Sequence, residues 1–190
     1  TNVTLLGGPF GNGSDYRCRF GPAGLMVPAT PVVDDSAALH CQSPAVAASA
    51  FEGLVGHIDG LLEVTLNGQQ YSASGHEYHT YRPPRVSSLS PVSGPVLGGT
   101  LMRVYGHSLA PGFHRLCRFT LASPADREAV RVGATVDASV GADGALLCLT
   151  PPNATNATQP ATVELTLNGQ QYTLDAARFD FFEPPSVSSV

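Results

Sequence analysis

The sequence feature that most constrains the fold is a ten-residue stretch that occurs twice. Residues 62–71 read LEVTLNGQQY and residues 163–172 read VELTLNGQQY, a spacing that matches the size of one small domain. In each copy, apolar and polar residues alternate up to an Asn-Gly pair, which is typical of a two-residue type I′ hairpin turn. We therefore predict two equivalent hairpins that turn at Asn67-Gly68 and Asn168-Gly169, pairing residues 61–66 with 69–72 and residues 161–167 with 170–174.

The rest of the chain is typical of an all-β protein. Its 20 glycines and 16 prolines lie between short apolar runs, and no long stretch has helical periodicity. Short strands at regular spacing, with turn residues between them, indicate a β-sandwich. Residues 45–60 have no counterpart of similar sequence in the second copy, and we interpret them as a loop with one helical turn at most.

The repeat divides the chain into domains. We predict one domain at residues 1–84 and a second at 85–185, each ending at a Pro-Pro pair, which is a short and stiff link. Residues 85–99 lead into a strand predicted at 100–106, whereas the matching strand at 1–7 has no such lead-in, so we expect the first domain to lack its first strand. Residues 186–190 repeat the start of the second domain and are interpreted as the start of a further repeat.

Four cysteines allow three disulfide pairings, and the repeat selects among them. Cys18 and Cys117 both precede an Arg-Phe pair, while Cys41 and Cys148 both begin a Cys-x-x-Pro motif. One early and one late cysteine per repeat predict the disulfides Cys18–Cys41 and Cys117–Cys148, each contributing about 3–4 kcal/mol of stability. Two pairs of buried free thiols are the alternative.

Four N-x-Ser/Thr sequons accompany these cysteines, at Asn2, Asn12, Asn153 and Asn156. One sequon arises easily by chance, but four of them together with paired cysteines indicate an oxidising, extracellular setting. Asn153 and Asn156 share one loop, so we expect that crowding limits glycosylation there to one of them.

Charge excludes one large class of function. The ten basic residues are all arginines and are scattered, and the net charge is −5, so the basic stripe of a nucleic-acid-binding domain is missing. We expect no nucleic-acid partner. No apolar run approaches the 18 residues of a membrane-spanning helix, so we expect no direct membrane insertion of this segment.

Motifs that could carry chemistry have simpler interpretations, and we predict neither catalytic residues nor a cofactor. Gly106-His107-Ser108-Leu109-Ala110 resembles a nucleophile elbow, but it lacks the final Gly and the helix that this motif requires. His76 and His79 would face opposite sides of a strand, which argues against a shared metal ion, and we predict no metal site. Acidic residues at 34–35 and 126–128 are interpreted as solvated loop charges, with a calcium ion between domains left open.

The second copy resembles a known family. The run from Val86 to Gly106 (VSSLSPVSGP, then GGT, then VYG) is similar to the opening of IPT/TIG domains, the immunoglobulin-like domains of plexins, some transcription factors and many surface proteins. Cys-Arg-Phe, Cys-x-x-Pro, the Asn-Gly hairpin and the Phe179/Phe181 strand also fit that family. The resemblance implies immunoglobulin-like β-sandwiches in tandem repeats on a large extracellular protein, and the Lys-free, Ala/Gly/Pro-rich composition looks most like algal or protist surface proteins, some of them ciliary.

The resemblance implies a structural and adhesive module of a glycosylated cell-surface protein, a rod-like spacer whose partners are neighbouring repeats, other surface or filament proteins, or further copies of itself. The alternative is a carbohydrate- or ligand-binding module, or an accessory domain of a secreted enzyme. That alternative requires an exposed aromatic ridge, for which Tyr16, Tyr81 and Tyr105 are the candidates.

Overall fold

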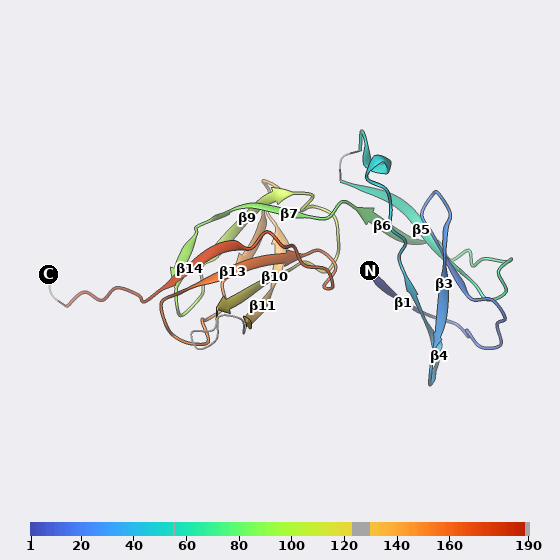
Figure 1. The fold of residues 1–190 in the computed structure, drawn as a ribbon, viewed down its shortest axis with the longest axis horizontal. Coiled ribbons are helices and arrows are strands. Elements are labelled where there is room, and N and C mark those ends of the chain that lie inside the picture. The colour runs from blue at the N-terminus through green and yellow to red at the C-terminus, as the bar shows by residue number, and fades with distance from the viewer. Residues whose placement is uncertain (55, 123–129, 189–190) are drawn as a thin grey trace. The chain divides into compact units, whose positions relative to one another are not determined.

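The computed structural model describes residues 1–54, 56–122 and 130–188 (Figure 1). Strands are the dominant regular structure among the described residues, which form two compact units, Thr1–Arg82 and Pro83–Val190. We call these the N-terminal and C-terminal units. The predicted all-β, immunoglobulin-like class is confirmed. No helix among the described residues is long and apolar enough to cross a membrane.

The N-terminal unit contains six strands, paired in the order β1-β4-β3-β2-β5-β6. All of its strand pairs are antiparallel. The strands are β1 (Asn2–Leu6), β2 (Arg17–Phe20), β3 (Leu25–Val32), β4 (Asp35–Gln42), β5 (His57–Thr65) and β6 (His76–Tyr81). Strand β3 pairs with β2 through its first half and with β4 through its second half, so it joins the two layers of the sandwich. Its two prolines, Pro28 and Pro31, lie beside this change of partner and its register shift.

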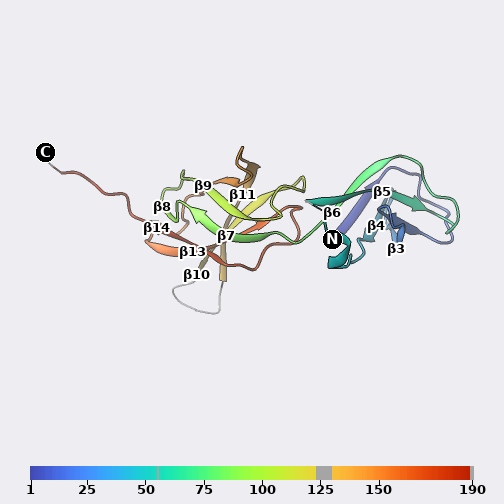
Figure 2. The same ribbon diagram turned by 90° about the horizontal axis from the view of Figure 1, so that it is seen from above.

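The C-terminal unit repeats this plan with two additional strands, in the order β7-β9-β12-β11-β10-β13-β14-β8. Its long strand β11 pairs with β10 and then with β12, as β3 does in the other unit. Strands β10, β13 and β14 lie side by side, which Figure 2 shows from a second direction. The strands are β7 (Arg85–Ser90), β8 (Ser93–Pro95), β9 (Leu101–His107), β10 (Leu116–Ala122), β11 (Val130–Val140), β12 (Leu146–Leu149), β13 (Gln159–Thr166) and β14 (Ala177–Phe182).

The core of the C-terminal unit is built from inward-facing residues of alternating strands. Phe119, Phe179 and Phe181 are fully buried and contact one another, with ring centroids 5.1–6.4 Å apart. Met102 and Val104 of β9 are also fully buried. Their counterparts in β1 of the N-terminal unit, Val3 and Leu5, are only half-buried. The N-terminal unit therefore has the same pattern of inward-facing residues, but its core is less completely covered.

The predicted hairpins differ from the structure in the second strand of each pair. Residues 69–72 and 170–174 form no strand, because only the isolated bridges Thr65–Tyr71 and Thr166–Tyr172 follow the turns. Strand β5 instead pairs with β6, and β13 with β14, across loops of about ten residues. Side-chain hydroxyls accept some of the backbone N–H groups that a second strand would otherwise bind. The Val64 N–H donates to Ser72 Oγ at 3.0 Å, and the Leu165 N–H donates to Thr173 Oγ1 at 3.1 Å.

The segment at 45–60 contains the one helical turn expected from sequence. It is the 3₁₀ helix η1 (Ala48–Phe51), which buries the Phe51 ring. Arg82 donates from Nη2 to the Phe51 carbonyl at 2.8 Å and lies over the same ring. Strand β5 nevertheless begins at His57, inside the segment that we had interpreted as loop.

Candidate functional site

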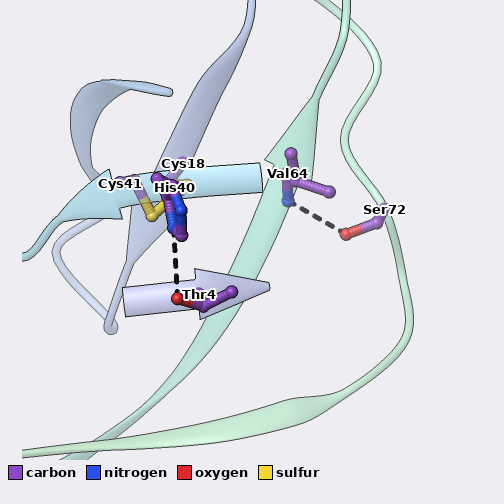
Figure 3. Close-up of a disulfide and its surroundings, with 6 residues drawn as sticks. All are labelled: Thr4, Cys18, His40, Cys41, Val64 and Ser72. Atoms are coloured by element: carbon purple, nitrogen blue, oxygen red, sulfur yellow. Dashed lines mark hydrogen bonds between the residues drawn. A yellow bond between two sulfur atoms is a disulfide. The ribbon is translucent and has the colours of Figure 1, made fainter. Parts of the chain in front are cut away.

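Each unit has one disulfide at its centre. Cys18 is joined to Cys41 across strands β2 and β4, and Cys117 is joined to Cys148 across β10 and β12, with Cα–Cα distances of 6.5 and 6.4 Å. These are the two pairs that the repeat predicts, and the described residues contain no free cysteine. Each disulfide connects the two layers of its sandwich at a buried position. Figure 3 shows Cys18 and Cys41 beside the hydrogen bond between Thr4 Oγ1 and His40 Nδ1 on β1 and β4.

The turns at the two Asn-Gly pairs are closed by the asparagine side chain. Asn67 Oδ1 accepts the N–H groups of Gln69 and Gln70 at 3.0 and 3.1 Å, and Asn168 Oδ1 makes the matching pair of bonds in the second copy. Gly68 and Gly169 have φ of 73° and 72°, but neither asparagine has positive φ. The type I′ geometry is therefore wrong, because it requires positive φ at both positions. The two asparagines therefore have a structural role, because their side chains stabilise the start of each long loop.

A repeated charged stack lies next to each disulfide strand. Arg19 of β2 pairs with Glu63 of β5 and covers the Tyr71 ring, its guanidinium carbon 3.9 Å from the ring centroid. In the C-terminal unit, Arg118, Glu164 and Tyr172 form the same group, again with 3.9 Å from guanidinium to ring. In both units the arginine therefore connects its own strand to the neighbouring strand and to the loop that follows that neighbouring strand. Sequence reasoning missed this cluster, although its members recur at matching positions of the two copies.

The sequon asparagines differ in accessibility. Asn2, Asn12 and Asn156 are exposed, but Asn153 is 2% exposed. Asn153 Nδ2 donates to the Ala157 carbonyl at 2.8 Å, and its Oδ1 accepts from Thr155 and Gln159. In this structure the Asn153 side chain organises the loop, and a glycan on its Nδ2 would conflict with these hydrogen bonds.

The segment from Gly106 to Ala110 lies in a different structural context from a nucleophile elbow. His107 ends β9, which pairs antiparallel with β7 and β12, and Ser108 follows in a turn with φ of 57° before the buried Leu109. This is not the parallel strand–turn–helix context that a nucleophile elbow needs. Asp35 Oδ1 accepts the Ala37 N–H at 2.9 Å at the turn into β4, and residues 126–128 lie outside the described part of the chain.

The three tyrosines that are candidates for an aromatic ridge do not belong to one unit. Tyr16 is half-buried, and its hydroxyl accepts the Gly13 N–H at 2.7 Å. Tyr81 is also half-buried, and Tyr105 belongs to the other unit. The ligand-binding alternative therefore has no specific structural observation in its favour.

The most distinctive open surface is an exposed strand edge in the N-terminal unit. Strand β1 pairs with β4 on one side and ends the sheet order on the other. In the C-terminal unit the corresponding strand β9 pairs with β12 and also with β7, which covers its other edge. An open groove of about 680 Å³ lies beside β1, lined by the apolar side chains of Leu5, Leu62 and Val64 among others. The counterparts of these three residues, Val104, Val163 and Leu165, are fully buried.

One carboxylate anchors β7 in the C-terminal unit. Asp175, in the loop before β14, accepts the Val86 N–H at 2.7 Å and pairs with Arg85 at 3.1 Å. The Val86 hydrogen bond is the main reason that the pKa of the Asp175 carboxyl lies below its ordinary value; partial burial opposes this shift and Arg85 adds to it. The residue at the corresponding position of the N-terminal unit is Ser74, which lines the open groove.

Comparison with known proteins agrees with this architecture. A family model described as IPT/TIG domain matches residues 84–181. No curated protein matches the chain. Among solved structures, the chain is similar to the full extracellular region of plexin A4 with domains 1 to 10, at 14% identity and a TM-score of 0.57, covering 100% of this chain and 15% of that one.

A second structure of the plexin A4 extracellular region, with domains 1 to 8 built, has 17% identity and a TM-score of 0.32, covering 94% of this chain and 25% of that one. That similarity is too low to support an argument. At these identities the likeness to plexin A4 concerns the fold alone, and this chain spans less than a fifth of the first structure's length.

Proposed function

Because this chain belongs to the IPT/TIG domain family, we propose that it is a non-catalytic interaction module of a longer extracellular protein. The two disulfides across the sandwich layers support an oxidising location. We further propose that residues 1–84 and 85–185 are successive domains of one family, that residues 186–190 begin another, and that the series acts as a spacer on a cell surface, including that of a cilium.

The observation that carries the interaction role is the position of β1 at the edge of its sheet within residues 1–82. Unpaired backbone N–H and C=O groups along an edge strand can accept a further strand, and apolar side chains beside it favour burial. In the C-terminal unit that position is taken by β7 with its buried Leu89. We therefore propose that the β1 edge and its groove receive an extended segment that resembles β7, supplied by the residues that precede Thr1 in a longer protein, by a neighbouring repeat or by another protein.

The proposed glycoprotein character rests on three accessible sequons. Asn2, Asn12 and Asn156 are exposed, whereas the Asn153 side chain is hydrogen-bonded within its loop. Asn2 is the first residue of β1, so a glycan there would stand beside the proposed contact edge and limit which partners reach it.

The interaction role is tested by supplying the missing strand. A variant carries a second copy of residues 84–99 directly before Thr1, which reproduces the junction that precedes Thr100 in the other unit. We expect hydrogen exchange in β1 to slow, and the free energy of unfolding of the N-terminal unit to rise by about 2 kcal/mol, because Val3 and Leu5 become covered. The matched control carries aspartate in place of the added copies of Val86 and Leu89, which contribute the apolar face.

Unchanged exchange in β1 of the extended variant, or an equal effect of the aspartate control, would contradict the strand-acceptor role. Sedimentation velocity provides the second readout. The starting chain is expected to self-associate at high concentration through its open edge, and the extended variant to remain monomeric. A monomeric starting chain at all concentrations would argue against self-association as a partner mode.

A further inference from the structure

Two histidines and an aspartate meet on the outer face of the N-terminal unit, at a place where the sequence analysis expected no metal. His57 and Asp59 lie on β5, two residues apart, and His79 lies opposite Asp59 on β6. Alternate residues of a strand share a face, and directly opposed residues of antiparallel strands bring their Cβ atoms within about 5.5 Å. The pairing register therefore brings all three side chains together.

This face is turned away from the core. Tyr78, the residue before His79 on β6, points to the other side and packs its ring against Phe20, with 4.9 Å between the ring centroids. Leu62 is buried on the same inner side. His57 and Asp59 are exposed and His79 is half-buried, so an ion can reach the cluster from solvent. His76 and His79 do face opposite sides of β6, and the donors that join His79 come from β5 instead.

The donor atoms are already close. Asp59 Oδ1 lies 2.8 Å from His57 Nε2 and 2.6 Å from His79 Nδ1. The two imidazole rings are perpendicular, with centroids 4.8 Å apart, and one ligand atom from each of the three residues lies within 4.8 Å of the others. Ligand atoms of a tetrahedral zinc site are about 3.3 Å apart, given zinc–ligand bonds of about 2.0–2.1 Å. Small side-chain rotations are sufficient to reach that geometry.

We propose that His57, Asp59 and His79 bind a divalent transition-metal ion, with Zn²⁺ as the best fit. Two imidazole nitrogens and one carboxylate are ligands that Zn²⁺ and its neighbours in the first row accept, whereas Ca²⁺ prefers six to eight oxygens. Three protein ligands leave the fourth zinc position for water or for a side chain of a partner.

Glu77 supplies a supporting carboxylate. Its Oε2 lies 3.9 Å from His79 Nε2, the ring nitrogen that does not face Asp59. This distance is too long for a hydrogen bond. A side-chain rotation that brings the carboxylate within reach of Nε2–H would leave Nδ1 available for the metal, as in many carboxylate–histidine–zinc arrangements. The ion would link β5 to β6, the edge strand of this sheet.

The C-terminal unit lacks the site and is an internal comparison. Asp59 and His79 correspond to Pro160 and Asp180, which are paired in the same register, and His57 corresponds to Thr158. One ion per chain is therefore expected, held by the N-terminal unit.

The test is titration of the chelator-treated full chain with ZnCl₂, followed by calorimetry and by the imidazole signals in NMR. We expect one saturable site, perturbation of the His57 and His79 signals, and binding at least about tenfold weaker in His79→Asn and His57→Asn. Glu77→Gln is expected to weaken binding by about tenfold, since it affects only the orientation of His79. His76→Asn, an exposed histidine on the opposite side of β6, is the matched control and should bind normally.

Absence of saturable binding to the starting chain would overturn the proposal, as would equal loss in His76→Asn and His79→Asn. Thermal unfolding without metal shows whether each variant is folded. Should His79→Asn fail to fold, the starting chain still decides the matter: Zn²⁺ must raise its Tm in a concentration-dependent way, and EDTA must reverse the rise. A Tm indifferent to Zn²⁺ contradicts the site.

Discussion

The guanidinium carbon of Arg118 lies 3.9 Å from the centroid of the Tyr172 ring. Arg19 and Tyr71 repeat this distance in the N-terminal unit. In each unit the arginine follows a disulfide cysteine and also pairs with a glutamate on the adjacent strand. The stack therefore fastens the loop after the Asn-Gly turn to the centre of the sheet.

Replacing this arginine tests the stack. Arg118→Lys keeps the charge but loses the planar contact with the ring, and we expect a loss of about 1 kcal/mol in the free energy of unfolding. Arg118→Leu also leaves Glu164 without its partner, and should cost about 2 kcal/mol. Urea unfolding measures both. A double-mutant cycle with Tyr172→Leu should give a coupling energy near 1 kcal/mol, and a coupling of zero would mean that the two groups only lie near each other.

Removal of the two disulfides is expected to affect the two units differently, although the disulfides close loops of similar length. Each contributes about 3–4 kcal/mol by restricting the unfolded chain. The N-terminal unit has a thinner cover, with Val3 and Leu5 half-buried, so the double variant Cys18→Ala/Cys41→Ala should unfold that unit. The variant Cys117→Ala/Cys148→Ala should keep its unit folded at lower Tm, because the aromatic core remains. Hydrogen exchange resolved by peptide distinguishes the units; equal loss of protection in both would contradict this ranking.

Asp175 makes the attachment of β7 dependent on pH. The pKa of its carboxyl is lowered in the folded chain, so its stabilising effect is present above the ordinary value of 3.8 and is lost as the pH falls toward the lowered pKa. We expect Asp175→Asn to reduce stability by about 1 kcal/mol at neutral pH, and this difference to shrink as the pH falls below 3.8. Denaturant unfolding of both proteins across this range is the measurement. A difference that is independent of pH would show that charge at Asp175 is unimportant.

The sequons give a prediction that separates Asn153 from the others. After secretion from a eukaryotic host, glycans are expected at Asn2, Asn12 or Asn156 and not at Asn153, whose Nδ2 is bonded to Ala157. Asn153→Gln should destabilise the C-terminal unit by about 1–2 kcal/mol, while Asn2→Gln should be close to neutral. Mass spectrometry of glycopeptides checks occupancy, and a fully occupied Asn153 would contradict the loop structure.

Much of the architecture could be predicted because the sequence contains two copies of one repeat, which can be compared with each other. The repeat places both disulfide pairs, since one early and one late cysteine recur in each copy. Alternation along the strand predicted at 100–106 puts Met102 and Val104 on one face, and both are buried. These features depend on local period and on spacing, which a sequence displays directly.

Other features could not be predicted because one residue type serves two purposes. Asparagine before glycine suits positive φ, but its side chain can also close a turn by accepting backbone N–H groups, and Asn67 and Asn168 do the latter. Asn153 matches a sequon and instead holds its loop. The His57–Asp59–His79 cluster was missed because β5 begins inside an Ala- and Gly-rich segment. The alternation from His57 to Leu62 was the signal that could have revealed it.

The most direct test of the account compares hydrogen exchange in β1 and β9 within the same chain. These strands hold matching positions, but β9 is covered by β7 and β1 is not. We predict that amides of Val3 to Leu6 exchange much faster than those of Met102 to Tyr105, and that adding residues 84–99 before Thr1 brings the two strands to similar protection. Equal protection of β1 and β9 in the unextended chain would contradict the open edge on which the proposed interaction role depends.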